Sequence, residues 1–362
     1  MRVAHVAEMY ELMPYNGIEV WVKRFVEFLN SSGIPSRVYQ YSDDIASYIP
    51  NAIKKIPNVR ELFIYPYLGK KIIHDIDHNV DIIHYNSPMT AAWIEKCKPS
   101  VTSVHYLISR QSEFLSKYLP LKYKFIFNRI SIDFLKSTER KGFFKTDFIL
   151  VPREAYKEYL ISAMSIPSER IFISKYGIDS RMFWPNPEKV EKENIALFVG
   201  RGSLAKGFDT LIEAANKING KVVALTKQVS AQLMRKIKKL SNFEIRTNLS
   251  DADVVKLYQQ ALVFVLPSLT EGSSISTLEA MACGLPVVCT SEGGGDYIRD
   301  GENGYLFPFG DSIGLAEKVN YLFKYREVAN RFGAINRKIV ETEFSLPKIS
   351  EKIIELYKQL VP

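Results

Sequence analysis

Short apolar runs alternate with helical patterns along the first half of the chain. Runs at residues 2–7, 37–41, 81–85, 100–105 and 147–151 each have the length of a buried strand. After the first run, apolar side chains recur every three or four positions, as on one face of a helix. These side chains are Ile18, Trp21, Val22, Phe25 and Leu29. Such alternation of strands and helices is typical of parallel β-α-β units.

A charged segment with two prolines interrupts this pattern near the middle of the chain. It covers residues 182–194 and has the composition of a linker between domains. The alternation then begins again, with strand-length apolar runs separated by helical patterns across residues 195–266. We therefore expect an α/β protein with two doubly wound sheets, one in residues 1–184 and the other in residues 185–344.

The C-terminal tail has the pattern of an amphipathic helix. Over residues 346–360, one helical face carries Ile349, Ile353, Leu356 and Leu360. A helix of this kind needs a partner surface for its apolar face, and the pattern does not identify that surface.

Length and composition restrict the class of protein. A chain of 362 residues is long enough for about two domains, each with its own core. No run approaches the roughly 20 apolar residues of a membrane-spanning helix, and the N-terminus lacks the features of a signal peptide. Three cysteines without metal-ligand spacing, Cys97, Cys283 and Cys289, are expected to be reduced and buried. These features predict a cytoplasmic protein.

The net charge of +8 is concentrated in residues 110–145, which hold nine basic and three acidic residues with aromatic residues between them. Interleaved basic and aromatic side chains can contact an anionic membrane surface or nucleic acid. A solvated helix face above a buried stripe fits the same pattern. No nucleic-acid-binding motif accompanies the charge, so we do not expect nucleic acid as a partner. Peripheral contact at the inner face of a membrane stays open.

The most informative segment is residues 267–288. A predicted strand leads into a loop of Gly and Ser, which opens a short apolar helix that ends at Gly284. Unpaired backbone N–H groups at a helix start can bind an anion. Glu271 lies in the loop, and Glu279 lies about two turns into the helix, where an unpaired charge would be costly. Two carboxylates beside an anion site suit a diphosphate between two polyols, as in a nucleotide sugar.

A second loop carries two cations. Arg201 and Lys206 lie in a Gly-rich loop between a predicted strand and a predicted helix. Two fixed cations there can bind a diphosphate and stabilise the charge that grows on it as a leaving group. The loop is not a Walker A loop, because Lys206 precedes Gly207 instead of following it.

Three weaker candidates lie near predicted strand and helix ends. Gly17 begins the first predicted helix, where a missing Cβ lets backbone approach a phosphate. His105 follows a predicted strand, and ligands of open α/β sheets bind at such strand ends. Asp251 and Asp253 match a metal-binding Asp-x-Asp pair, but Ser250 before them predicts a helix cap instead. We expect no metal ion.

Several of these segments resemble motifs of the family-4 retaining glycosyltransferases. Residues 267–288 resemble the Glu-x7-Glu motif of that family, with Ser273-Ser274 where the family usually has Phe-Gly. Residues 200–207 resemble its Gly-Arg-x4-Lys-Gly element, and residues 102–105 resemble its Thr-Val-His element. The resemblance implies the GT-B fold, in which two Rossmann-like domains face each other across a cleft. It also implies that the terminal helix, residues 345–362, joins the first domain.

The resemblance implies transfer of a sugar from a nucleotide diphosphate sugar to an acceptor hydroxyl, with retention of configuration and without a cofactor or metal. The acceptor could be a glycan, a lipid-linked molecule or another hydroxyl compound. By this resemblance the catalytic residues are His105, Arg201, Lys206 and Glu271; the donor-binding residues are Gly17, Gly272, Ser273, Ser274, Ile275 and Glu279; and His84 and Asn86 lie on the acceptor side.

Two other functions fit the same residues. Nucleotide-sugar 2-epimerases share this two-domain architecture and need no acceptor. A non-catalytic protein that binds nucleotide sugars or polyanions would also fit the charge and the Ser273-Ser274 pair. The donor base, the transferred sugar and the acceptor do not follow from the residues.

Overall fold

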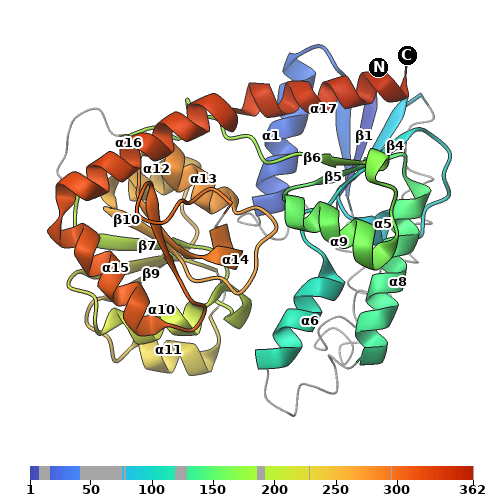
Figure 1. The fold of residues 1–362 in the computed structure, drawn as a ribbon. Coiled ribbons are helices and arrows are strands. Elements are labelled where there is room, and N and C mark those ends of the chain that lie inside the picture. The colour runs from blue at the N-terminus through green and yellow to red at the C-terminus, as the bar shows by residue number, and fades with distance from the viewer. Residues whose placement is uncertain are drawn as a thin grey trace. The chain divides into compact units, whose positions relative to one another are not determined.

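The computed structural model describes residues 1–7, 17–40, 76, 79–118, 129–185, 192–227, 229–294 and 296–361. Parts of the predicted linker (186–191) and of the basic and aromatic segment (119–128) lie outside these residues. The chain divides into two compact units (Figure 1). Unit 1 contains Met1–Tyr176 and Ile349–Pro362, and unit 2 contains Gly177–Lys348.

Unit 1 is built on one parallel sheet of six strands in the order β2-β1-β3-β4-β5-β6. The strands are β1 (Val3–Ala7), β2 (Ser36–Gln40), β3 (Ile82–Tyr85), β4 (Ser100–Ser103), β5 (Phe148–Val151) and β6 (Ile171–Ile173). The chain passes from β1 to β2 on one side and later returns to β3 on the other side. The order of the strands therefore reverses between β1 and β3, which is where open α/β sheets bind ligands at their carboxyl ends.

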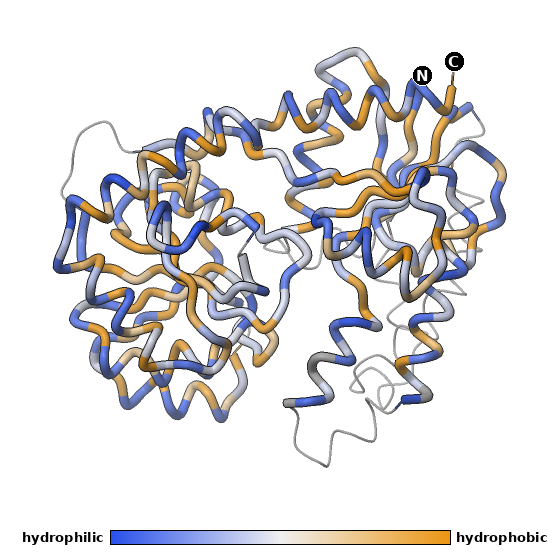
Figure 2. The backbone as a smooth tube through the Cα atoms, in the orientation of Figure 1, coloured by the Kyte–Doolittle hydropathy of each residue, from blue (hydrophilic) through white to orange (hydrophobic). Residues whose placement is uncertain are grey.

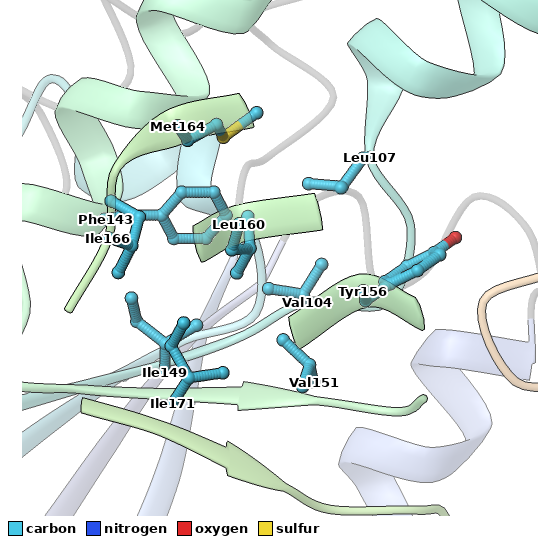
Figure 3. Packing of buried hydrophobic residues seen from close by; sticks show 10 residues of the cluster. All are labelled: Val104, Leu107, Phe143, Ile149, Val151, Tyr156, Leu160, Met164, Ile166 and Ile171. Carbon is cyan, nitrogen blue, oxygen red and sulfur yellow. The ribbon is translucent and has the colours of Figure 1, made fainter. Parts of the chain in front are cut away.

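Helices cover the faces of this sheet. They are α1 (Gly17–Ser31), α5 (Pro88–Ala91), α6 (Ile108–Tyr118), α8 (Arg129–Lys145), α9 (Glu154–Met164) and the C-terminal part of α17 (Leu346–Leu360). One core cluster lies between the sheet and α8 and α9, and Figure 3 shows Phe143 of α8 pointing toward Leu160 of α9. Its strand residues include Ile149 and Val151, which the apolar pattern predicted to be buried.

Unit 2 repeats the plan, with a six-stranded parallel sheet in the order β12-β11-β10-β7-β8-β9. The strands are β7 (Ile195–Val199), β8 (Lys221–Leu225), β9 (Phe243–Arg246), β10 (Val263–Leu266), β11 (Val287–Thr290) and β12 (Gly304–Phe307). The helices are α10 (Phe208–Ala215), α11 (Ala231–Ile237), α12 (Asp251–Gln260), α13 (Ile275–Ala282), α14 (Ser291–Gly294), α15 (Ser312–Lys324) and α16 (Arg326–Glu343). Here the strand order reverses between β7 and β10, so the loops after these two strands are neighbours.

The terminal helix α17 packs its apolar face within unit 1. Figure 2 shows apolar and polar turns alternating along this helix. Ile349, Ile353 and Tyr357 are buried, whereas Leu356 is only half-buried, so Tyr357 replaces it on the predicted apolar face. The Tyr357 hydroxyl lies 2.5 Å from Nδ1 of His84 in β3, and its ring contacts Phe25 of α1. This contact identifies the partner surface that the sequence pattern left open.

The cysteines differ from expectation at one position. Cys283 and Cys289 are buried and reduced as predicted, but Cys97 is exposed. Cys97 lies in the polar turn between α5 and β4, where no apolar surface covers it. The prediction that it is buried was therefore wrong. Over the described residues, no helix combines the length and the apolar character that crossing a membrane requires.

Candidate active site

The loop after β7 and the loop after β10 meet at a glycine. Gly207 has a φ of +62°, and a Cβ built on it would lie 1.9 Å from the carbonyl oxygen of Pro267. A larger residue cannot occupy this place without moving one of the loops. The backbone N–H of Leu269 also donates to the carbonyl of Ala205 at 2.9 Å. The two loops that carry the predicted cations and the first predicted carboxylate are thus held together by backbone contact.

This contact places Lys206 against Glu271. The Lys206 Nζ lies 2.5 and 2.6 Å from the two carboxylate oxygens of Glu271, and both side chains are largely buried, 20% and 11% exposed. The hydroxyl of Ser268 donates to the same carboxylate at 2.7 Å. The carboxylate therefore holds the ammonium group in a fixed position at the carboxyl edge of the sheet.

The start of α13 lies directly after this pair. Ser274 caps the helix, because its hydroxyl accepts from the backbone N–H of Thr277 at 3.2 Å. Ser273 forms a hydrogen bond with the hydroxyl of Tyr297. Within the described part of the chain, the backbone N–H groups of residues 272–276 donate to no acceptor. Consecutive N–H groups of this kind at a helix start bind anions well, since the helix dipole adds to their partial positive charge.

Glu279 occupies the next turns of α13. Its carboxylate is 8% exposed and accepts a hydrogen bond from the hydroxyl of Tyr258 on α12 at 3.0 Å. Tyr258 itself is fully buried and packs against Phe264 of β10. The carboxylate is thus oriented by a rigid neighbour, which the sequence pattern did not reveal because Tyr258 lies 21 positions earlier.

Two cations stabilise the other end of α13. Arg337 donates to the carbonyl of Ala282 at 2.8 Å, and Lys192 donates to the carbonyl of Gly284 at 3.1 Å. Cations at a helix C-terminus complement its dipole. Burial lowers the pKa of Lys192 to about 8. Burial, helped by the nearby Glu279 charge, raises the pKa of Cys283 to about 12, so this thiol is protonated near neutral pH.

Arg201 is in the same loop as Lys206 but not in the ion pair. It is exposed, and its side chain has no hydrogen bond or ion pair within the described residues. Of the four charged residues predicted in unit 2, the structure therefore joins Lys206 to Glu271, places Glu279 along the adjoining helix, and leaves Arg201 at the surface of the loop.

In unit 1, a small pocket of about 40 Å³ lies where the strand order reverses. Ala7 at the end of β1 lines it, and Asn86 and His105 line it after β3 and β4. Two carboxylates, Glu19 and Glu139, also line it, together with Ser87 and Tyr106. Gly17 is the first residue of α1. The two residues that follow it, Ile18 and Glu19, line the pocket.

His105 is held by two protein partners. Its Nδ1 lies 2.5 Å from the hydroxyl of Tyr176, and its Nε2 lies 3.3 Å from the amide oxygen of Asn86. An amide oxygen only accepts, so Nε2 carries the proton and Nδ1 accepts from Tyr176. Burial lowers the pKa of His105 to about 3, and the ring is therefore neutral near pH 7.

His84 does not line this pocket. It is 1% exposed, and its Nδ1 and Nε2 are bonded to Tyr357 and to the hydroxyl of Ser103, the latter at 2.7 Å. Burial, with His5 and His105 nearby, lowers its pKa well below the ordinary value. His84 therefore links β3 to α17 in the core of unit 1, and its contact with an acceptor stays a prediction. Asn86, two residues later, does face the pocket.

The Asp-x-Asp segment has the predicted capping role. The hydroxyl of Ser250 accepts from the backbone N–H of Asp253 at 3.2 Å and begins α12. Among the described residues, no cluster of three or more His, Cys, Asp or Glu side chains is arranged to hold a metal ion.

Comparison with known proteins identifies the family. The family model described as "Glycosyl transferases group 1" matches residues 181–339, and the model described as "Glycosyltransferase Family 4" matches residues 15–181. The two matches adjoin and together span both units. The chain belongs to the group 1 glycosyltransferases of the family-4 type. It is therefore a glycosyltransferase, as the motifs of residues 200–207 and 267–288 implied.

Relatives from bacteria agree with this assignment. The O-antigen chain mannosyltransferase C of Escherichia coli is 25% identical over 100% of this chain and 99% of its own length. The alpha-maltose-1-phosphate synthase of Mycolicibacterium smegmatis is 26% identical over 54% of this chain and 58% of its own length.

Solved structures of other proteins share the fold. Sucrose-phosphate synthase from Thermosynechococcus elongatus is similar with a TM-score of 0.80 and 19% identity, over 99% of each chain. HepE of Anabaena, solved in complex with UDP-glucose, has a TM-score of 0.74 and 16% identity, over 99% of this chain and 100% of its own. These likenesses and the two parallel sheets confirm the α/β GT-B fold.

Proposed function

We propose that this glycosyltransferase takes a sugar from a nucleotide diphosphate sugar bound in unit 2 and transfers it to an acceptor hydroxyl. The observation that carries the proposal is the Lys206–Glu271 pair beside the N–H groups of residues 272–276, which donate to no acceptor among the residues that the structure describes. A diphosphate needs both a localised cation and several hydrogen-bond donors, and this edge of the sheet supplies both.

The diphosphate would replace Glu271 as the ion-pair partner of Lys206. Its oxygens would accept from the N–H groups at the start of α13 and from the ammonium of Lys206. Glu271 would then be free to accept hydrogen bonds from hydroxyls of the transferred sugar. Because leaving-group charge grows on the diphosphate in the transition state, the contact with Lys206 strengthens as the glycosidic bond breaks. The exposed Arg201 is on the same loop and can supply a second charge.

The remaining contacts with the donor follow from the hydrogen-bond partners that each residue already has. Glu279, oriented by Tyr258, would accept from the two ribose hydroxyls. Ser273 and Ser274 are engaged with Tyr297 and Thr277, so they would shape the loop while the amides of Gly272 to Ile275 contact the ligand. We propose that no metal ion is needed, since Lys206 and Arg201 supply the positive charge. The family resemblance supports retention of configuration.

The pocket in unit 1, at about 40 Å³, would receive one hydroxyl of the acceptor or of the transferred sugar. Asn86, oriented by neutral His105, would accept one more hydrogen bond at its amide oxygen and donate one more from its amide nitrogen to sugar hydroxyls. Gly17 begins the helix that forms one side of the pocket. Relatives named as an O-antigen mannosyltransferase and as a capsular polysaccharide glycosyltransferase support a glycan acceptor. Structures of HepE with UDP and with UDP-glucose support a nucleotide-sugar donor.

A thermal-shift panel of UDP, GDP and ADP, each alone, tests donor binding. We expect one of them to raise the unfolding temperature, because a ligand at 100 times its Kd stabilises the native state by about 2.7 kcal/mol. The variant Glu279→Gln should bind that nucleotide about tenfold more weakly, because a carboxylate acceptor becomes a neutral amide. If none of the three shifts the wild type, the donor proposal is wrong.

Incubation of the matching nucleotide sugar without acceptor separates transfer from the alternatives. A transferase should give slow hydrolysis and, with acceptor added, a new glycoside. Conversion of the sugar to its 2-epimer would identify an epimerase, and binding without turnover under either condition would identify a non-catalytic binding protein.

We further propose that α8 contacts an anionic membrane surface, where a lipid-linked acceptor would be found. Lys136 and Lys141 lie on this helix with the exposed Phe134 and Phe144, which are 44% and 45% exposed. Arg129 adds an almost fully exposed charge. Basic side chains near exposed aromatic residues bind anionic lipid headgroups, and each charge is worth roughly 1 kcal/mol near such a surface.

Sedimentation with phosphatidylglycerol liposomes tests the membrane proposal. We expect binding at low salt that weakens as salt screens the charges, and a loss of at least about tenfold when Arg129, Lys136 and Lys141 are replaced by Gln. A control variant with Gln at Lys236, Lys238 and Lys239, three exposed lysines of unit 2 whose replacement removes the same charge, should bind as the wild type does. Equal loss in both variants would show that only net charge matters.

A further inference from the structure

Glu139 is a fully buried carboxylate that joins α8 to the start of α6. Its Oε1 accepts from the backbone N–H groups of Ile108 and Ser109, at 2.6 and 3.3 Å. The hydroxyl of Ser109 donates to its Oε2. All three donors come from residues about thirty positions earlier in the chain, so Glu139 serves as the N-terminal cap of a helix to which it does not belong.

The segment that Glu139 holds is one wall of the pocket in unit 1. Tyr106 and Ile108 line the pocket on this side, and Glu139 itself is part of the lining. His105, immediately before them, is fixed separately by Tyr176 and Asn86. The chain between His105 and α6 is therefore held at both ends, by the histidine at one end and by Glu139 at the other.

A purely stabilising role does not explain this carboxylate well. Removing a charge from water is costly, and the cost here is visible because burial raises the pKa of Glu139 to about 7 even though its three hydrogen bonds lower it. A Ser or Asp in place of the buried Leu107, directly before α6, could cap the helix locally without a distant carboxylate. What Glu139 adds is a fixed connection between α6 and the pocket wall.

We propose that Glu139 is a positioning residue for the acceptor, which fixes residues 106–108 so that the pocket holds a sugar hydroxyl in place. The proposal rests on the proposed function, because it assigns the pocket of unit 1 to the acceptor. Glu139 would not touch the reacting atoms. It would act through the backbone of Ile108 and Ser109, with little effect on the donor site in unit 2.

Two substitutions separate positioning from burial. Glu139→Gln keeps an oxygen that accepts from Ile108 and an amide that donates to the hydroxyl of Ser109. Glu139→Leu keeps a similar volume but leaves three donors without an acceptor. Glu113→Gln, an exposed position on α6, is the matched control for loss of a carboxylate. Each variant is assayed with the nucleotide sugar that the thermal-shift panel selects, and with octyl α-D-mannopyranoside and octyl β-D-glucopyranoside as acceptors.

For Glu139→Leu we expect an acceptor KM raised at least about tenfold, or an equal fall in the ratio of transfer to donor hydrolysis. The Kd of the nucleoside diphosphate should change less than about twofold. Hydrogen exchange of the peptide covering residues 106–118 should be faster. Glu139→Gln should restore all three values to near those of the wild type, and Glu113→Gln should not differ from it. Ser109→Ala, which removes one of the three bonds, should shift the same ratio by a few-fold.

Several results would overturn the proposal. One is a Leu variant with unchanged acceptor KM and unchanged transfer ratio, whatever its stability. Another is a Gln variant as impaired as the Leu variant. If Glu139→Leu does not fold, an unchanged transfer ratio in Ser109→Ala would also overturn it. A wild type that binds nucleotide but transfers to neither glycoside, and only hydrolyses the donor, would instead contradict the assignment of the pocket to these acceptors.

Discussion

Replacing Lys206 by Ala should lower kcat/KM at least about tenfold. A charge-assisted hydrogen bond contributes roughly 1.5–3 kcal/mol, and every 1.4 kcal/mol corresponds to a factor of ten. The substitution also leaves Glu271 without its ion-pair partner, since Lys206 lies 2.5 Å from this carboxylate. The carboxylate would then repel the incoming diphosphate. Steady-state kinetics with the selected nucleotide sugar measure the change, which we expect mainly in kcat because leaving-group charge is greatest in the transition state.

Lys217→Ala is the matched control for this prediction. Lys217 is an exposed lysine just after α10, and its ammonium group donates only to the carbonyl of Glu213 within the described residues. Its removal changes the net charge of unit 2 by the same amount without touching the loops. Near-normal turnover in Lys206→Ala, or equal losses in both variants, would remove Lys206 from the reaction.

Replacing Gly207 by Ala should destabilise unit 2 and separate the two loops. The added Cβ would meet the carbonyl of Pro267 at 1.9 Å, and φ at this position is +62°. The left-handed conformation costs about 1–2 kcal/mol and the overlap about 1–3 kcal/mol more. At roughly 2–4 °C per kcal/mol for a domain of this size, we expect the unfolding temperature to fall by about 5–15 °C. Calorimetry measures the fall.

Gly301→Ala isolates the contribution of the loop contact. Gly301 has a φ of +78°, but a Cβ there would meet no atom within 4 Å. The Gly301→Ala substitution therefore carries the conformational cost without the overlap, and the unfolding temperature should fall by only about 2–8 °C. Nucleotide affinity should fall in Gly207→Ala alone, because only that substitution moves Lys206 away from Glu271. Equal effects of the two substitutions would mean that the Gly207–Pro267 contact does not shape the site.

The strands and the main helices could be predicted from the sequence where the apolar pattern within a single element is clear. The first three predicted strands of unit 1 and the helix over residues 346–360 agree with the structure to within a residue or two. The short β6 and β9 lie at the outer edges of their sheets, are less buried, and were not predicted. Their apolar runs are short because an edge strand has less core to face.

The two loops of unit 2 could be singled out from the sequence for the same reason. Lys206 and Glu271 each lie in a loop whose composition identifies it, and the family resemblance links the loops to one function. Their contact was not predictable, because it depends on Gly207 reaching Pro267, 60 positions later in the chain. The chemical type of each residue follows from the sequence, whereas the distances between them follow from the strand order.

The residues that line the pocket of unit 1 were harder to predict from the sequence. His84 and Asn86 lie two residues apart, a spacing that would place both on one face of a continuous strand. β3 ends at Tyr85, however, and His84 is bonded to Tyr357 in the core whereas Asn86 lines the pocket. Sequence spacing alone does not tell which of them faces a ligand. In the sequence, Glu139 is only one of three acidic residues in a basic segment. Nothing nearby in the chain shows that Ile108 and Ser109 donate hydrogen bonds to it.

The central claim is that unit 2 holds a sugar-bearing diphosphate between Lys206 and the start of α13. A crystal structure of the protein with the nucleotide diphosphate that raises its unfolding temperature tests this most directly. We predict phosphate oxygens within about 3.2 Å of Lys206 Nζ and of N–H groups among residues 272–276, with the ribose hydroxyls on Glu279. A diphosphate bound elsewhere, with the Lys206–Glu271 pair intact and those N–H groups unoccupied, would contradict it.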